Sequence, residues 1–225
     1  VAHSHFSGPC QESQLEKYQR VDQINQVGLN SLRTLVKDNS INCDWIESGI
    51  YHTAADNNSE IECDHFINYL KKRDITHIPL SKQEIHNHLG TSWYKKGVKV
   101  ENGALMQPAK LVFGLAKNLP SNVELYENTP VLRMTLGKAV TVMVPDAIIT
   151  AEQVIMACNY ETFEGAKPKQ RAVGVTLSGS ITSALTKDEI NTLGSESSWG
   201  ILSLHSGGAT IRLTDDGRIA IRNTA

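Results

Sequence analysis

The spacing of apolar residues predicts an alternation of helices and strands along the chain. Between Leu15 and about Lys37 the apolar positions recur at helical intervals, which indicates a long amphipathic helix. Residues 41–54 end in a run of β-forming side chains, and residues 77–80 form a second short apolar segment. Both segments are typical of strands, so the first part of the chain mixes the two kinds of element.

Three capping boxes predict where shorter helices begin. In a capping box a Ser or Thr is followed three residues later by Glu, and the two side chains satisfy backbone N–H groups at the start of a helix. The chain contains Ser59-x-x-Glu62, Ser81-x-x-Glu84 and Thr186-x-x-Glu189. We expect a helix to follow each of them.

The stretch from Gly103 to Tyr160 predicts part of an α/β layer. Pro108 suits the first turn of a helix, and leucines then repeat every four residues along one face. The strands expected after this helix are 123–126, 131–134, 140–144, 147–150 and 154–157. The last of them is a continuous apolar run, which is typical of a strand covered on both faces. Strands of such a layer commonly end at a ligand.

The C-terminal part of the sequence predicts further strands. Residues 172–184 are rich in Val, Thr, Ile and Ser. The tripeptide Asp215-Asp216-Gly217 is a turn sequence between the alternating segments 210–213 and 219–221, which indicates a hairpin. Together with the segments near residues 50 and 78, these strands form an antiparallel or mixed sheet.

The fold class that follows is α+β (mixed α/β). A sheet backed by helices contains the strands from both ends of the chain, and the middle segment is inserted into it. The predicted divisions are residues 1–104, 105–165 and 166–225.

Composition and charge exclude several classes of function. The 225 residues carry 22 basic and 24 acidic side chains, a net charge of −2, so no electrostatic footprint for nucleic acid is present. No apolar stretch is long enough to span a bilayer, and the N-terminus lacks the layout of a signal peptide. The four cysteines contain no C-x-x-C pair, and the two His-x-His sequences do not predict a metal site. We expect a cytoplasmic protein with reduced thiols.

Several sequences in a fixed order resemble those of a known family. In the middle of the chain these are QPAKLVFGLA, ENTPV and ITAEQVIMACNY. Cys43-Asp44 and Ser48–Tyr51 precede them, and Trp199–Arg218 contains the others. The pattern resembles the flavin-dependent amino-acid and amine oxidoreductases of the D-amino-acid oxidase family, especially the gamma-glutamylputrescine oxidoreductase type. The resemblance extends over nearly the whole chain.

The resemblance implies a cofactor, a reaction and a domain assignment. The cofactor is FAD, and the reaction is the oxidation of a C–N bond in a small amine or amino acid by hydride transfer to the flavin. Residues 105–165 would be a partial FAD-binding segment, and the flanking parts would belong to a substrate domain. The G-x-G-x-x-G turn that holds the pyrophosphate does not occur in the sequence. We therefore expect an internal fragment that lacks this turn and a C-terminal part.

The resemblance also places cofactor contacts on the middle segment. Val131 stands where the backbone of the family contacts adenine, and Ala157, Cys158 and Asn159 stand at a strand end beside the dinucleotide. Cys158 occupies a position where the family commonly has Thr or Gly. The alternative is that Val131 is a core strand residue and Cys158 a buried thiol.

The candidate substrate-binding residues are Tyr51, His52 and Arg212. A sheet that covers the flavin directs every second side chain toward the site, and a guanidinium holds a carboxylate through two parallel hydrogen bonds. The alternatives are a hydrogen-bonded structural role for His52 and, for Arg212, a solvated or ion-paired sheet position near Asp215 or Asp216. No catalytic acid or base is assigned, because the cofactor accepts the hydride. The competing function is a non-catalytic α+β module that binds a small ligand or a partner.

Overall fold

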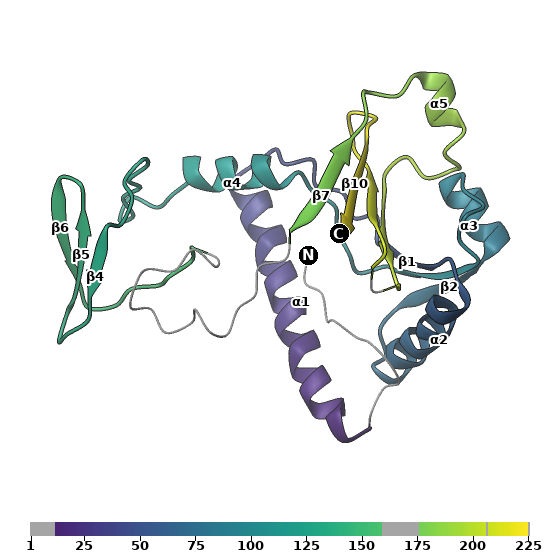
Figure 1. Cartoon of the computed structure of the whole chain (residues 1–225), viewed down its shortest axis with the longest axis horizontal. Coiled ribbons are helices and arrows are strands. Elements are labelled where there is room, and N and C mark those ends of the chain that lie inside the picture. Colours follow the sequence, from purple (N-terminus) through teal and green to yellow (C-terminus); the bar gives the residue numbers. More distant parts are fainter. Residues whose placement is uncertain (1–11, 159–175, 206, 225) are drawn as a thin grey trace. The chain divides into compact units, whose positions relative to one another are not determined.

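The computed structural model describes residues 12–158, 176–205 and 207–224 (Figure 1). The chain divides into two compact units. The first unit contains the chain up to Asn118 together with the chain from Leu177 onward, and the second unit begins at Leu119. Each unit has a sheet of its own.

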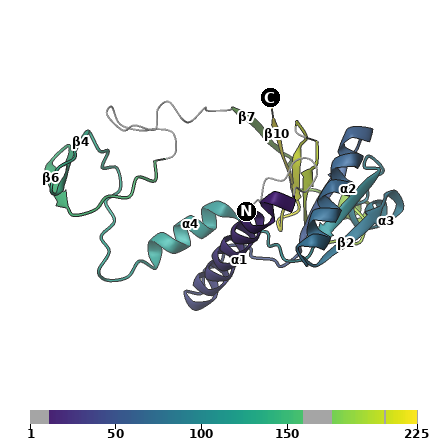
Figure 2. The same cartoon turned by 90° about the horizontal axis from the view of Figure 1, so that it is seen from below.

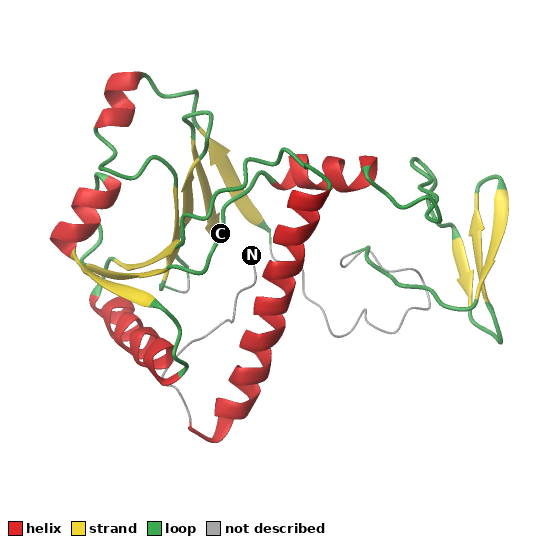
Figure 3. Ribbon diagram, turned by 180° about the vertical axis from the view of Figure 1, so that it is seen from behind, coloured by secondary structure: helices red, strands yellow, loops and turns green. Residues whose placement is uncertain are grey.

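The first unit contains all the helices of the described chain and a sheet of seven strands (Figure 3). The helices are η1 Glu12–Gln14, α1 Leu15–Asp38, α2 Asn57–Lys72, α3 Lys82–Leu89, α4 Pro108–Lys117 and α5 Lys187–Asn191. The strands are β1 Ile50–Ala54, β2 His77–Ser81, β3 Lys96–Val100, β7 Leu177–Ile181, β8 Trp199–Ser203, β9 Thr210–Leu213 and β10 Ile219–Thr224. Their order across the sheet is β2-β3-β1-β8-β9-β10-β7.

One parallel pair joins the two ends of the chain within this sheet. β1 and β8 run parallel, with Tyr51 opposite Ile201, and the other neighbours are antiparallel. The predicted mixed sheet and the α+β class are therefore confirmed.

Helices cover both faces of the sheet at its β1–β3 side. On one face Ile85 and Leu89 of α3 pack with Tyr51 and Ile201 in a buried cluster. On the other face α2 packs against β1 and β3, and its side chains bury Ala54. Figure 2 shows α2 and α3 next to β2 at this side of the sheet. Burial of these apolar side chains, at roughly 25 cal/mol per Å², is the main stabilising contribution to this half of the unit.

Polar contacts hold the long helix α1 against its surroundings. The Asp22 carboxylate accepts hydrogen bonds from the Tyr69 hydroxyl at 2.9 Å and from Arg73 Nε at 3.0 Å, both on or beside α2. At the other end of α1, Arg33 donates to the two carboxylate oxygens of Glu47 at 2.6 and 2.8 Å. The predicted long helix is thus confirmed, and its polar side chains fix its position in the first unit.

The second unit contains a three-stranded β-meander, which includes the strands predicted at 140–144 and 147–150. It consists of β4 Arg133–Thr135, β5 Val140–Val144 and β6 Ala147–Ala151, all antiparallel. The strands expected at 123–126 and 154–157 are wrong, because both segments are irregular. Ile155 is 92% exposed instead of buried. A strand needs a neighbour for its backbone groups, and the described chain supplies none to these two segments.

The helix starts are partly as predicted. The boxes at Ser81 and Thr186 cap α3 and α5 as expected. The box at Ser59 is wrong, because the N-cap of α2 is Asp56 and Ser59 is its third residue. The Ser59 N–H donates to the Asp56 carboxylate at 2.9 Å, and the Ser59 hydroxyl accepts in return from the Asp56 N–H. An Asp preceding the Ser by three residues serves equally well as a cap.

Strand positions differ from prediction in three places. β3 and β8 are absent from the prediction, since the sequences KGVKV and WGILS show no clear alternation. The strand expected over 172–184 is limited in the described chain to β7, and residues 172–175 lie outside the described residues. The hairpin of β9 and β10 forms around Gly217 as predicted.

The C-cap of α3 gives a test of the fold. Gly90 has φ +68°, and a Cβ there would lie 2.2 Å from the Thr192 carbonyl oxygen. Gly90→Ala should therefore lower the free energy of unfolding by about 1–3 kcal/mol, because it adds backbone strain and a clash. The measurement is urea unfolding followed by circular dichroism.

Gly28→Ala is the matched control. Gly28 lies inside α1, and apart from its own helix no described residue comes within 4 Å of the position that a Cβ would occupy, so alanine should stabilise the chain by up to about 1 kcal/mol. Equal stability of Gly90→Ala and the parent chain would contradict the close contact between α3 and the segment at Thr192.

Candidate functional site

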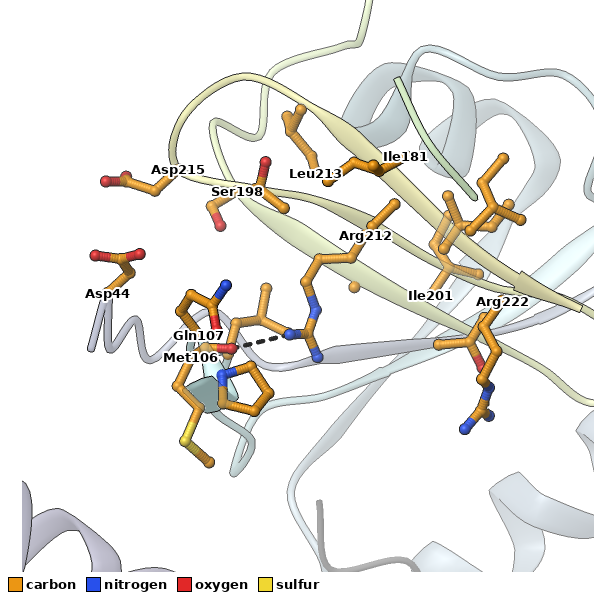
Figure 4. Close-up of a pocket in the computed structure, with 18 of the residues that line it drawn as sticks. Asp44, Met106, Gln107, Ile181, Ser198, Ile201, Arg212, Leu213, Asp215 and Arg222 are labelled. Atoms are coloured by element: carbon orange, nitrogen blue, oxygen red, sulfur yellow. Dashed lines mark hydrogen bonds between the residues drawn. The ribbon is translucent and has the colours of Figure 1, made fainter. Parts of the chain in front are cut away.

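A cavity of about 750 Å³ lies on the main sheet over β8, β9, β10 and β7 (Figure 4). The strand registers place Gly200, Arg212, Ala220 and Ile181 side by side in one row across these strands. All four residues line the cavity. Because side chains alternate along a strand, this face is the one opposite to the cluster that contains Ile201 and Leu213.

The wall of the cavity is the segment from Leu105 to Pro108, which precedes α4. The Ile46 and Leu105 backbones exchange two hydrogen bonds of 2.9 Å, and the Gln107 N–H donates to the Cys43 carbonyl at 2.8 Å. Leu105 packs directly over Gly200, where a Cβ would lie 2.8 Å from the Leu105 side chain. Glycine at position 200 therefore lets the Leu105 side chain lie close to the sheet, and a larger residue would displace the end of that side chain.

Arg212 is the cationic group at the centre of the cavity floor. Its Nη1 donates a hydrogen bond to the Met106 carbonyl at 2.9 Å, as Figure 4 shows. The side chain is half-buried, and burial lowers the pKa of its guanidinium. Arg212 forms no ion pair with the described residues. The predicted alternative of an ion pair with Asp215 or Asp216 is therefore wrong. A guanidinium has five N–H donors, and most of those of Arg212 remain available to an anion.

The carboxylates at the rim of the cavity are mostly neutralised by neighbours. Both oxygens of Asp44 accept from Lys110 Nζ at 2.7 Å. The hydrogen bond with Asp44 raises the pKa of Lys110. Asp216 accepts from Arg218 Nε at 2.9 Å and from the Thr214 hydroxyl at 2.6 Å. The rim therefore contributes little uncompensated negative charge.

The structure brings only Arg212, of the three predicted substrate residues, to the cavity. Tyr51 points to the opposite face of the sheet, where it is buried. His52 lies on the same face as Arg212 but packs on the Phe66 ring of α2, with ring centroids 4.6 Å apart. Neither Tyr51 nor His52 lines the cavity. Strand alternation separates Tyr51 from the site, and the cover of α2 separates His52 from it.

Tyr51 belongs instead to a polar network around Glu196. Glu196 Oε1 accepts from the Tyr51 hydroxyl at 2.9 Å and from Lys99 Nζ at 3.1 Å, and His88 Nδ1 lies 3.3 Å away. Burial, and then the Glu196 carboxylate, raise the pKa of the Tyr51 hydroxyl far above its ordinary value. Burial alone would raise the pKa of Glu196, but the hydrogen bonds from Tyr51 and Lys99 outweigh it and lower that pKa.

The predicted cofactor residues lie in the second unit. Val131 is partly buried directly before β4, whereas Ala157 and Cys158 are exposed in the irregular segment after β6. The alternative of a buried thiol at Cys158 is thus wrong. Asn159 lies outside the described residues. A contact of these residues with FAD stays a prediction.

Sequence reasoning misses several residues of the cavity. It does not single out Met106, Gly200 or Arg222, although all of them line the cavity. Arg222 has a usable indication in the sequence: the turn at Asp215–Gly217 fixes the hairpin, and the hairpin register places Arg222 opposite Thr210 on the face of Arg212. Met106 contributes its backbone carbonyl, for which side-chain identity gives no indication.

A family model described as "FAD dependent oxidoreductase" matches residues 2–225 of the chain. A curated protein of Rhizobium meliloti (strain 1021), "Probable oxidoreductase OrdL", is 33% identical over 82 residues, which are 36% of this chain and 19% of that protein. The chain thus spans only a small share of that relative's length.

Solved structures with the same fold include two enzymes named for amino acids. Glycine oxidase from Geobacillus kaustophilus superposes with a TM-score of 0.67 at 15% identity, over 99% of this chain and 58% of that one. L-proline dehydrogenase from P. horikoshii gives 0.65 at 13% identity, over 95% of this chain and 57% of that one. The chain spans less than three fifths of either structure. In the part of the chain that is described, no helix has the length and apolar character needed to cross a membrane.

The Glu196 network predicts a pH dependence of stability. Because its folded pKa is lowered, Glu196 contributes stability above the unfolded value of about 4.3 and loses this contribution as pH falls through the folded pKa. Glu196→Gln should therefore be less stable than the parent chain at pH 7. The difference between their free energies of unfolding should shrink as the pH is lowered from about 6 to about 3. The measurement is urea unfolding of both proteins at each pH.

Glu16→Gln, on α1, is the control for loss of one carboxylate. At pH 7 it should lose less stability than Glu196→Gln, because Glu16 forms no hydrogen bond or ion pair with the described residues and has only its place in the first turn of α1, worth at most about 1 kcal/mol. A constant difference between Glu196→Gln and the parent chain over this pH range would contradict the stabilising role of the ionised carboxylate.

Proposed function

The chain belongs to the family of FAD-dependent oxidoreductases, and from this premise we propose that the whole protein oxidises the C–N bond of a small amino acid or amine. In this proposal the first unit supplies the substrate side of the active site, and the cavity over β8–β10 receives the substrate. The observation that carries the proposal is the half-buried guanidinium of Arg212 in that cavity, which has no counter-ion within the described residues.

A carboxylate is the group that suits this guanidinium best. Desolvation of an unpaired charge is costly, and an incoming carboxylate offsets that cost through two parallel charge-assisted hydrogen bonds. The hydrogen bond to Met106 holds the guanidinium plane in place before the substrate binds. The names of glycine oxidase and L-proline dehydrogenase support an amino acid as substrate class, although at their low identity they establish only the fold.

The described residues fit part of FAD and not all of it. The sequence contains no G-x-G-x-x-G turn, so none of its strand–helix junctions offers the glycine backbone that a pyrophosphate approaches. The open cavity, in contrast, has a fixed cation among apolar residues, and its volume of about 750 Å³ is in the usual range for a small-molecule site. When bound, FAD supplies the hydride acceptor.

The residues of this chain would orient the substrate rather than transfer protons. Arg212 would fix the carboxylate, and the wall from Leu105 to Pro108 would set how deeply the substrate enters. We retain Val131, Ala157, Cys158 and Asn159 as proposed FAD contacts of the second unit and a cytoplasmic location as a proposal. Tyr51 and His52 have no part in the proposed substrate site, because neither lines the cavity.

Flavin content is the first test of the proposal. The protein encoded by the complete reading frame that includes this chain, purified from flavin-replete cells, should be yellow and show a flavin absorption spectrum. The spectrum should bleach under anaerobic conditions when the amino acid or amine substrate is added. A colourless protein under these conditions would contradict the proposal and would favour the non-catalytic binding module.

Replacement of Arg212 is the second test. Arg212→Gln should raise the KM for a carboxylate-bearing substrate about 10- to 100-fold, because a hydrogen bond to a charged group is worth roughly 1.5–3 kcal/mol. Arg212→Lys should recover part of the loss, since it keeps the charge but not the fork. Arg20→Gln, at an exposed position of α1 outside the cavity lining, should keep the parent KM. An unchanged KM in Arg212→Gln would exclude Arg212 as the carboxylate ligand.

A further inference from the structure

A second guanidinium lies on the same face of the sheet as Arg212. In the β9–β10 register Arg212 is opposite Ala220 and Arg222 is opposite Thr210. The two arginines are therefore diagonal neighbours on adjacent strands, about 7–8 Å apart at the backbone. Both line the cavity, and Figure 4 shows both side chains on the same side of the ribbon.

Each guanidinium is anchored separately. Arg212 donates to the Met106 carbonyl at 2.9 Å, and Arg222 Nη2 donates to the Thr210 hydroxyl at 2.9 Å. These anchors come from different segments of the chain, so the two groups are held at distinct positions. Neither forms an ion pair with the described residues.

Three carboxylates and three cations line the cavity, but the two arginines pair with none of these carboxylates. Asp44 is paired with Lys110, and Asp216 with Arg218, so these carboxylates are already neutralised. The carboxylate that is left, Asp215, is exposed on the β9–β10 turn and lies away from both guanidinium groups (Figure 4). Two like charges on neighbouring strands repel each other, and anions bound beside them relieve this repulsion.

We propose that the site selects an amino acid that carries a second carboxylate, with Arg212 holding one carboxylate and Arg222 the other. This inference rests on the proposed function only for the placement of the first carboxylate. One guanidinium fork satisfies one planar carboxylate, so a monocarboxylate leaves the second fork unpaired. A dicarboxylic substrate pairs both.

The test uses calorimetric titration of the chain at pH 7 and constant ionic strength with three probes. Glutarate has two carboxylates, pentanoate has one on a chain of the same length, and inorganic phosphate concentrates its charge on one centre. Glutarate should bind about three- to tenfold more tightly than pentanoate. The effect is modest because Arg222 is exposed, and an exposed ion pair with the second carboxylate is worth roughly 1 kcal/mol.

Variants assign the preference to the residue. Arg222→Gln should abolish the preference for glutarate and leave the dissociation constant of pentanoate unchanged, whereas Arg212→Gln should weaken both ligands. Arg133→Gln, in the second unit, removes the same charge and should change neither. The comparison of glutarate with pentanoate on the parent chain needs no variant, so it remains decisive if Arg222→Gln does not fold.

The outcomes separate this inference from the proposed function. Equal binding of glutarate and pentanoate, with both weakened in Arg212→Gln, would overturn the second carboxylate site and leave the role of Arg212 intact. Tightest binding of phosphate would overturn the inference in favour of a site for a single doubly charged group. Absence of binding by all three probes would overturn the inference and the proposed carboxylate site together.

Discussion

The parallel pairing of β1 with β8 is the constraint on which the rest of the first unit depends. It places Tyr51 opposite Ile201 and so joins two segments from opposite ends of the chain. The antiparallel partners β3 and β2 then extend the sheet on one side, and β9, β10 and β7 extend it on the other. A parallel pair requires a long connection, and the whole middle of the chain, including the second unit, lies in that connection.

The same pairing decides which side chains share a face. With the register fixed, Gly200, Arg212 and Ala220 fall into one row, and their neighbours Ile201 and Leu213 point into the core on the other face. α2 covers this face at β1, β3 and β2, and the cavity lies over the other strands, β8, β9, β10 and β7. A cation fixed on a rigid sheet beside an apolar wall is suited to orienting an anionic ligand.

The features that the sequence predicts well are local, and those that it does not predict depend on distant contacts. The Ser81 and Thr186 caps and the turn at Gly217 depend on side chains within a few residues, and the structure contains all three. The ordered motifs identify the family, which the family model confirms over residues 2–225. β3, in contrast, carries Lys96 and Lys99, and it is a strand because β1 and β2 flank it. The apolar run at 154–157 is irregular, since the described chain gives it no neighbouring strand. The face on which Tyr51 lies follows from the register of β1 with β8, and no local sequence pattern reveals that register.

The central claim is that Arg212 receives a carboxylate in the cavity over β8–β10. A crystal structure of the chain with bound pentanoate tests it most directly. The account predicts carboxylate oxygens about 2.7–2.9 Å from the guanidinium nitrogens of Arg212, with the hydrogen bond to Met106 retained. A carboxylate bound elsewhere, with Arg212 hydrogen-bonded to Met106 alone, would contradict it.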